Sequence, residues 1–277
     1  MASQPLIFAH RGASAVAPEN TLPAFTKALE MGADGIELDV QATAEGELVV
    51  LHDFNLEGTT TGRGRIRKHT LAQLSDLDAG IRFNDAFSGT PIPTLDQVFE
   101  LTANRCIVNV EIKNMDWDGG PEAGPLTRMI QRRRLYDKVI VSSFNPFSLR
   151  SVRQLDPHIP IGLLYKPKLP RPVGPRAPLI AAALKLSPNH LFFHLFRTWS
   201  ASILAPDALH PHFQSINSAL MAEARRRGQI VNAWTVNCGT EARRLAALGV
   251  NAIITDRPDA IRQALSEAGP VASPSDA

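Results

Sequence analysis

The chain of 277 residues has little cysteine, no long apolar run and no excess of charge of one sign. Its two cysteines, Cys106 and Cys238, lie far apart in the sequence, which excludes a small scaffold held together by disulfide bonds. Because disulfides are uncommon in the cytosol, we expect both thiols to be free and buried. No stretch approaches the roughly 18 consecutive apolar residues that a transmembrane helix needs, so we expect no stable membrane insertion.

The balance of charge points away from polyanionic partners. Lys and Arg number 29 and Asp and Glu number 27, for a net charge of +2, which argues against a protein built to bind nucleic acid. The first residues carry neither a basic segment nor a long apolar segment, so we expect no secretory signal and predict a cytoplasmic location. Hydrophobic residues make up 44% of the chain and charged residues 20%, which excludes a disordered chain.

Short apolar runs alternate with longer segments of helical periodicity along the whole chain. This alternation predicts a parallel sheet, and eight strand candidates fit an α/β fold of the TIM-like (β/α)8 barrel type better than an open sheet. The predicted strands are Leu6–Ala9, Gly35–Val40, Cys106–Ile112, Lys138–Ser142, Pro160–Leu164, Ala208–His210, Ile230–Thr235 and Ala252–Thr255. The predicted helices are Thr21–Met31, Thr94–Thr102, Leu126–Leu135, Pro146–Leu155, Ala219–Arg227, Thr240–Leu248 and Pro258–Ser266.

Other segments do not follow this alternation. Residues 53 to about 92 are interpreted as a small insertion after the hairpin of the second strand. Residues 166–178 hold five prolines and four basic residues, which is typical of a stiff exposed loop. We expect one barrel domain over residues 1–268 and a disordered tail over residues 269–277.

Charged residues occupy alternate positions of two predicted strands. Glu37 and Asp39 are two residues apart, so on a strand both carboxylates point to one face, as do Asn109, Glu111 and Lys113. In a barrel this charged set would face the interior, where buried carboxylates repel one another unless a cation lies between them. Oxygen ligands of this kind suit one divalent ion, Mg²⁺ or Ca²⁺, better than zinc.

Two histidines are predicted to lie beside these carboxylates. His10 ends the first strand, and barrel enzymes assemble their sites at the C-terminal ends of their strands. A two-residue turn at Glu45-Gly46 would pair residues whose numbers sum to 91, which sets His52 opposite Asp39 on one face. A shift of register by one residue would turn His52 away.

The surrounding charges indicate a phosphate ester as the substrate. Two histidines beside a metal can act as general acid and general base, and Arg11 and Lys113 add positive charge suited to a phosphate. Three other residues have two interpretations each. His210 and His212 either line the mouth of the barrel or pack within the fold, and Trp234 is either part of the core or a wall against the substrate.

The sequence resembles the glycerophosphodiester phosphodiesterases, the cytosolic bacterial kind especially, from Ile7 to about Ile261. The motifs that carry the resemblance are AHRGASAVAPENTLPAF, GADGIELDVQATAEGELVVLHDFNLEGTTTGRG, PIPTLDQVFEL, VNVEIKN, VIVSSFNPFSLRSVRQLDP, VNAWTVN and GVNAIITDRPD. The resemblance implies a TIM-like barrel with a small insertion, and hydrolysis of a glycerophosphodiester to sn-glycerol 3-phosphate and an alcohol. The nucleophile is left open between water and the substrate's own 2-hydroxyl group, which would give a cyclic phosphate.

The resemblance also implies a role for each matching residue. The metal ligands would be Glu37, Asp39 and Glu111, and the acid–base pair would be His10 and His52. The residues that contact the phosphate would be Arg11 and Lys113, with Trp234 against the glycerol side and Asn20 bracing the first loop. The sequence departs from the family pattern at Gly58, where an arginine usually precedes the paired threonines, and over residues 166–199.

Three other functions remain as alternatives. A lysophospholipase D-type enzyme would use the same centre on a lipid with one acyl chain. The apolar residues between Leu191 and Trp199 could cover that chain or touch a membrane surface, or they form a helix whose apolar face packs on the barrel. A barrel that binds phosphodiesters without cleaving them is disfavoured because every expected site residue is present. A phosphatidylinositol-type phospholipase C typically lacks this set of three carboxylates. The sequence leaves the head group, the physiological metal and the oligomeric state open.

Overall fold

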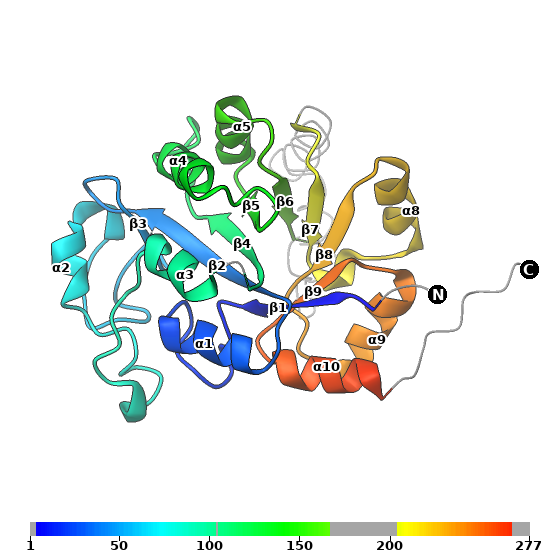
Figure 1. Ribbon diagram of the computed structural model, residues 1–277, viewed down its shortest axis with the longest axis horizontal. Helices are drawn as coiled ribbons and strands as arrows, with labels where there is room; N and C mark the ends of the chain where they lie inside the picture. The colour runs from blue at the N-terminus through cyan, green and yellow to red at the C-terminus, as the bar shows by residue number, and fades with distance from the viewer. Residues whose placement is uncertain (1–3, 104, 167–203, 268–277) are drawn as a thin grey trace, which may run out of the picture.

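Eight parallel strands close into a barrel in the computed structural model, which describes residues 4–103, 105–166 and 204–267. The strands follow the order β1-β2-β4-β5-β6-β7-β8-β9, and β1 pairs with both β2 and β9. Figure 1 shows the helices arranged around these strands. The predicted TIM-like barrel is therefore confirmed. The Pro-rich segment 166–178 (Lys166 excepted), the apolar stretch 179–199 and the tail 269–277 lie outside the described residues.

The barrel strands lie close to their predicted positions. They are β1 Leu6–His10, β2 Gly35–Ala42, β4 Ile107–Ile112, β5 Val139–Ser143, β6 Ile161–Tyr165, β7 Ala208–Pro211, β8 Ile230–Ala233 and β9 Ala252–Thr255. The helices are α1 Leu22–Glu30, α2 Leu71–Ser75, α3 Leu95–Thr102, α4 Ala123–Arg133, α5 Pro146–Leu155, α8 Ser218–Arg226, α9 Gly239–Leu248 and α10 Pro258–Ser266. Strand β8 is shorter than predicted, so Trp234 follows it rather than ending it.

Side chains at the helix starts explain several of these boundaries. Thr21 caps α1 by accepting a hydrogen bond from the Ala24 amide, and Thr94 forms a reciprocal capping box with Gln97 at α3. Such caps satisfy backbone amides that have no partner within the helix and stabilise it by about 1 kcal/mol. The boundaries therefore follow from local chemistry that the sequence displays.

The strand after β2 pairs one residue away from the predicted register. β3 (Leu48–Val50) is antiparallel to β2, and the paired residue numbers sum to 90, as in Gln41 with Val49, so the predicted sum of 91 is wrong. The connection is a three-residue loop, because the Thr43 amide donates to the Glu47 carbonyl and Gly46 takes the left-handed φ of +88°. A left-handed glycine at the third loop position is typical of three-residue hairpins.

The segment between β3 and α3 builds its own small apolar cluster. Leu51, Leu56, Ile66, Leu74 and Ile92 are buried together there. Figure 1 shows this segment, with α2, at the outer edge of the molecule beside β3. The cluster also includes Val49 of β3, so it packs directly against the strand that leads to His52.

Alternation along the strands separates an apolar outer face from a charged inner face. Ile36, Leu38 and Val40 of β2 pack with Phe25 of α1 and Val98 of α3 in one core between barrel and helices. The intervening β2 residues face the barrel interior. This arrangement concentrates the carboxylates predicted from the sequence inside one end of the barrel.

His210 lies within the barrel wall rather than at its mouth. The residue on β7 is 0% exposed, its Nε2 lies 3.1 Å from Asn232 Nδ2, and a β-carbon at Gly162 would clash with its ring. Burial lowers the pKa of His210 to about 3. The interpretation of His210 as packing within the fold therefore holds, and the mouth-lining alternative is wrong.

This buried histidine predicts a pH-dependent stability. Below pH 6.5, the ordinary pKa of histidine, the unfolded chain binds a proton at residue 210 that the folded chain does not. This residue alone should therefore lower the free energy of unfolding by up to about 1.4 kcal/mol per pH unit between pH 6 and 4. His210→Asn should have a shallower slope between pH 6 and 4 than the wild type in urea unfolding. Equal slopes would contradict this assignment.

The two thiols differ in exposure. Cys106 is buried as predicted, whereas Cys238 is exposed, so the prediction of a second buried thiol is wrong. Cys238 immediately precedes α9, where the chain runs over the surface before the helix begins. Within the described residues, no helix combines the length and apolar character needed to cross a membrane.

Candidate active site

Three carboxylates from two neighbouring strands converge inside the C-terminal end of the barrel. Asp39 of β2 pairs directly with Glu111 of β4, and Glu37 lies one inward position earlier on β2. One oxygen of each carboxylate lies within 4.8 Å of the others, and all three residues are buried. Three buried hard oxygen donors at such spacing fit a divalent cation.

The charges of these carboxylates oppose one another. Burial raises the pKa of Glu37 well above its usual range, and repulsion from Asp39 and Glu111 raises it further. Burial, then repulsion from Asp39, raises the pKa of Glu111 to about 7. Burial acts on Asp39 too, but Arg11 and Lys113 outweigh it and lower its pKa. A divalent cation would relieve this repulsion, which makes the set chemically suited to hold one.

Two side-chain cations flank the carboxylates. Arg11 Nε lies 3.3 Å from Asp39 Oδ2, and Arg11 Nη1 donates to both oxygens of Glu19 at 3.0 and 3.1 Å. Lys113 Nζ lies 3.1 Å from Glu111 Oε1 and 3.8 Å from Asp39 Oδ1. Arg11 and Lys113, the two residues predicted to contact the phosphate, thus both lie beside the carboxylates.

The loop after β1 is tied to β2 through Asn20. Its Nδ2 donates to Asp39 Oδ2 at 2.9 Å, and its Oδ1 accepts from the Asp39 amide at 3.2 Å. Gly12 allows the loop to pass close to α1, because it has a φ of +83° and a β-carbon there would lie 2.7 Å from Ala24. The loop therefore fixes both the carboxylate of Asp39 and the backbone that carries Arg11.

His10 is held between two carboxylates. Its Nδ1 lies 2.6 Å from Asp256 Oδ1, and its Nε2 lies 4.0 Å from Glu37 Oε2. Since an ionised carboxylate only accepts hydrogen bonds, Nδ1 carries the hydrogen and Nε2 faces the carboxylate set. The ring is therefore oriented for proton transfer through Nε2.

His52 reaches the same site although the hairpin register differs from the predicted one. Strand β3 ends at Val50, and Gln41 Nε2 donates to the carbonyls of Leu51 at 2.8 Å, His52 at 3.3 Å and Asp53 at 2.8 Å. These hydrogen bonds hold the bent backbone over residues 52–54 that follows the strand. Burial lowers the pKa of His52, and the charge of nearby Asp39 opposes that shift. His52 thus lies near the carboxylates because of the bend rather than because of strand pairing.

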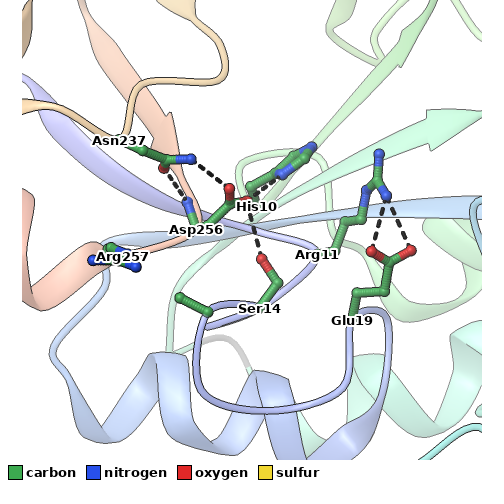
Figure 2. A pocket seen from close by; sticks show the side chains of 8 residues that line it. His10, Arg11, Ser14, Glu19, Asn237, Asp256 and Arg257 are labelled. Carbon is green, nitrogen blue, oxygen red and sulfur yellow. Dashed lines mark hydrogen bonds and ion pairs between the residues drawn. The ribbon is translucent and has the colours of Figure 1, made fainter. Parts of the chain in front are cut away.

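A cavity of about 600 Å³ opens beside His10. Its lining comes from the loop after β1 and from the segments that follow β8 and β9, and includes Arg11, Ser14, Asn237 and Asp256. Figure 2 shows His10 and Asp256 facing one another, with Arg11 directed away from them toward Glu19. The cavity gives a small molecule access to one side of His10.

Aromatic side chains form another part of the mouth. The Trp234 ring packs edge-on against Phe144 and against His212, each with centroids 5.4 Å apart, and Trp234 Nε1 donates to the His210 carbonyl at 2.7 Å. Lys166 Nζ lies 5.5 Å from the Trp234 ring centroid. Trp234 and His212 thus lie in one aromatic wall, and Trp234 also packs against a buried core cluster that includes Phe8 and Ile254.

Three acidic residues at this site were not predicted from the sequence. Asp256 holds His10, Asp53 Oδ1 lies 2.8 Å from His52 Nδ1, and Glu19 holds Arg11. Asp53 directly follows His52, and Glu19 lies eight residues from Arg11, so proximity in the sequence is a usable signal for both. Asp256 is 246 residues from His10, and only its position after the last barrel strand could have suggested it.

Known proteins are similar to this chain in sequence and in fold. The family model described as the glycerophosphoryl diester phosphodiesterase family matches residues 10–260. A glycerophosphodiester phosphodiesterase of Caldanaerobacter subterraneus is 38% identical over 95% of this chain and 99% of its own length. One from Bacillus subtilis is 32% identical over 92% of this chain and 84% of its own length. A phosphodiesterase of Oleispira antarctica, solved with the product sn-glycerol-3-phosphate, superposes with a TM-score of 0.78 at 27% identity, covering 95% of this chain and 97% of its own.

Proposed function

The chain belongs to the glycerophosphoryl diester phosphodiesterase family, and we propose that it hydrolyses glycerophosphodiesters to sn-glycerol 3-phosphate and an alcohol with one divalent metal ion. The observation that carries this proposal is the convergence of three buried carboxylates, two histidines and two cations at one end of the barrel. Relatives that are named for this activity align along nearly the whole chain, which supports the same reaction.

Glu37, Asp39 and Glu111 are the residues that would hold the metal. A bound Mg²⁺ or Ca²⁺ supplies Lewis-acid chemistry, which polarises a phosphoryl oxygen and lowers the pKa of a hydroxyl group. Lys113 and Arg11 add positive charge on either side of Asp39. Arg11 uses Nη1 and Nε in its contacts with Glu19 and Asp39, so Nη2 is directed to a phosphate oxygen in this proposal.

His10 and His52 divide the proton transfers. One removes a proton from the attacking hydroxyl, and the other gives a proton to the oxygen of the leaving alcohol. Each has a carboxylate at Nδ1, which leaves Nε2 as the nitrogen that exchanges the proton. The attacking hydroxyl belongs either to water or to C2 of the glycerol, and Trp234 forms the wall on the glycerol side.

Product analysis tests the proposed reaction. The protein should release sn-glycerol 3-phosphate and choline from glycerophosphocholine, and ³¹P NMR should show any cyclic phosphate formed on the way. Lysophosphatidylcholine serves as the comparison substrate, with choline release as the shared readout. Turnover of the lysolipid alone would replace the proposal by a lysophospholipase D-type activity. Release of phosphocholine would show that the bond on the glycerol side of the phosphate is cleaved, which would contradict the proposed reaction.

A further inference from the structure

A phosphodiester has two ester arms, and the proposed site surrounds them differently. The wall that contains Trp234 is assigned to the glycerol arm. The cavity beside His10 reaches Arg11, one of the two proposed phosphate contacts, and Trp234 is not among the described residues that line it. Its volume of about 600 Å³ lies within the range of about 300 to 1,000 Å³ that is typical of small-molecule sites. The cavity is therefore the space open to the alcohol arm.

Both carboxylates in the lining of this cavity already have hydrogen-bond donors. Glu19 accepts two hydrogen bonds from Arg11 Nη1, at 3.0 and 3.1 Å. Asp256 Oδ1 lies 2.6 Å from His10 Nδ1, and Asn237 Nδ2 donates to Asp256 Oδ2 at 2.5 Å. Figure 2 shows both groups of contacts. A bound alcohol therefore finds little free acceptor capacity on these carboxylates.

Among the described residues that line the cavity, Arg257 is the charged one without such a partner. Its backbone amide donates to Thr255 Oγ1 at 3.1 Å. Its guanidinium forms no hydrogen bond or ion pair with the part of the chain that the structure describes, and Figure 2 shows no contact from it to the rest of the lining. Arg257 is exposed, and it offers five N–H donors in a planar fork that matches a carboxylate. The free hydrogen-bonding capacity of the cavity is thus mainly that of a cationic donor.

We propose that this cavity is the subsite of the leaving alcohol, and that Arg257 makes it favour an alcohol that carries a carboxylate. The proposal rests on the proposed function, because there is a leaving alcohol only if the protein cleaves a glycerophosphodiester. A carboxylate on that alcohol accepts hydrogen bonds from the Arg257 fork. A head group with an ammonium alone meets the oxygens of Glu19 and Asp256, which other donors already occupy. Arg257 thus discriminates between head groups, whereas Arg11 and Lys113 serve the phosphate that all these substrates share.

Two substrates that differ by a single carboxylate test this preference. Glycerophosphoserine has the carboxylate and glycerophosphoethanolamine lacks it, and both carry the same ammonium group. Release of sn-glycerol 3-phosphate is the shared readout, at one metal concentration. Wild-type kcat/KM should be about 3- to 10-fold higher for glycerophosphoserine, as expected for one exposed hydrogen bond between charged groups. The preference should disappear in Arg257→Gln and invert in Arg257→Glu, where the introduced carboxylate repels that of the substrate.

Arg150→Gln is the matched control for the loss of charge. Arg150 is an exposed arginine of α5 outside the cavity lining, so its substitution changes the net charge equally and should keep the wild-type preference. An unchanged preference in Arg257→Gln, or no preference in the wild type, would overturn the proposal. An equal loss on both substrates in Arg257→Gln would overturn it too, because Arg257 would then act on a part that the two substrates share.

Binding distinguishes failure of this proposal from failure of the proposed function. If the wild type cleaves neither substrate, the proposed function fails, and NMR of the Arg257 Nε–H group still tests the carboxylate subsite. The resonance is assigned by its absence in Arg257→Gln. A saturable shift with glycerophosphoserine and a smaller one with glycerophosphoethanolamine would support the subsite, whereas equal shifts or none would overturn it.

Discussion

His10→Ala and His52→Ala should each lower kcat by a factor of about 100 or more, since general acid–base catalysis typically contributes this much. Both rings lie beside the carboxylate set, and both have Nδ1 occupied by an aspartate. The loss should appear in kcat rather than in KM, because a proton is transferred only as the transition state forms. Initial rates of sn-glycerol 3-phosphate release measure it directly.

An exposed histidine provides the control for these variants. His158 precedes β6 and lies at the N-terminal end of that strand, opposite the proposed site, so His158→Ala should keep the wild-type rate. A substrate with a better leaving alcohol should partly rescue whichever variant lacks the general acid, which distinguishes the two roles. Near wild-type turnover in either His10→Ala or His52→Ala would remove that residue from the mechanism.

Removal of the divalent ion is expected to abolish turnover, and Glu37→Gln should prevent its recovery. Glu37 is buried beside two further carboxylates, and its pKa is raised by that burial and by their repulsion. The glutamine keeps the size of the side chain but removes one negative charge from the three carboxylates. Loss of that charge should weaken metal binding strongly while the fold persists.

Thermal unfolding reports this binding independently of turnover. An ion that binds only the folded state stabilises it, by about 2.7 kcal/mol at 100 times Kd. Mg²⁺ or Ca²⁺ should therefore raise Tm of the chelator-treated wild type, and the rise should be much smaller in Glu37→Gln. Equal shifts in the two proteins would place the ion elsewhere.

The barrel could be predicted because the strands and helices are indicated by residue patterns within their own segments of the sequence. Alternation in GIELDV places Ile36 and Leu38 outward and Glu37 and Asp39 inward, and the structure has this arrangement. Caps such as Thr94 with Gln97 are equally local. Strand ends were less predictable, since β8 ends before Trp234. The pattern of side chains therefore predicted the elements and their faces better than their limits.

The partners of the two histidines could not be predicted in the same way. His10 and Asp256 meet because the barrel closes β1 against β9, which joins residues 246 positions apart. The proximity of His52 to Asp39 was predicted, but through a register that the three-residue loop at Gly46 excludes. The bend held by Gln41, which brings His52 to the site, depends on three carbonyls beyond the strand and leaves no periodic signal.

The most direct test of the account is metal-restored turnover of glycerophosphocholine. Chelator-stripped wild type and Glu37→Gln are assayed for sn-glycerol 3-phosphate without metal and after titration with Mg²⁺ or Ca²⁺. The account predicts no release without metal, full recovery of the wild type with at least one of the two ions, and little recovery of Glu37→Gln. Undiminished release by the stripped wild type, or recovery of Glu37→Gln at the same metal concentration as the wild type, would contradict a metal centre built on Glu37, Asp39 and Glu111.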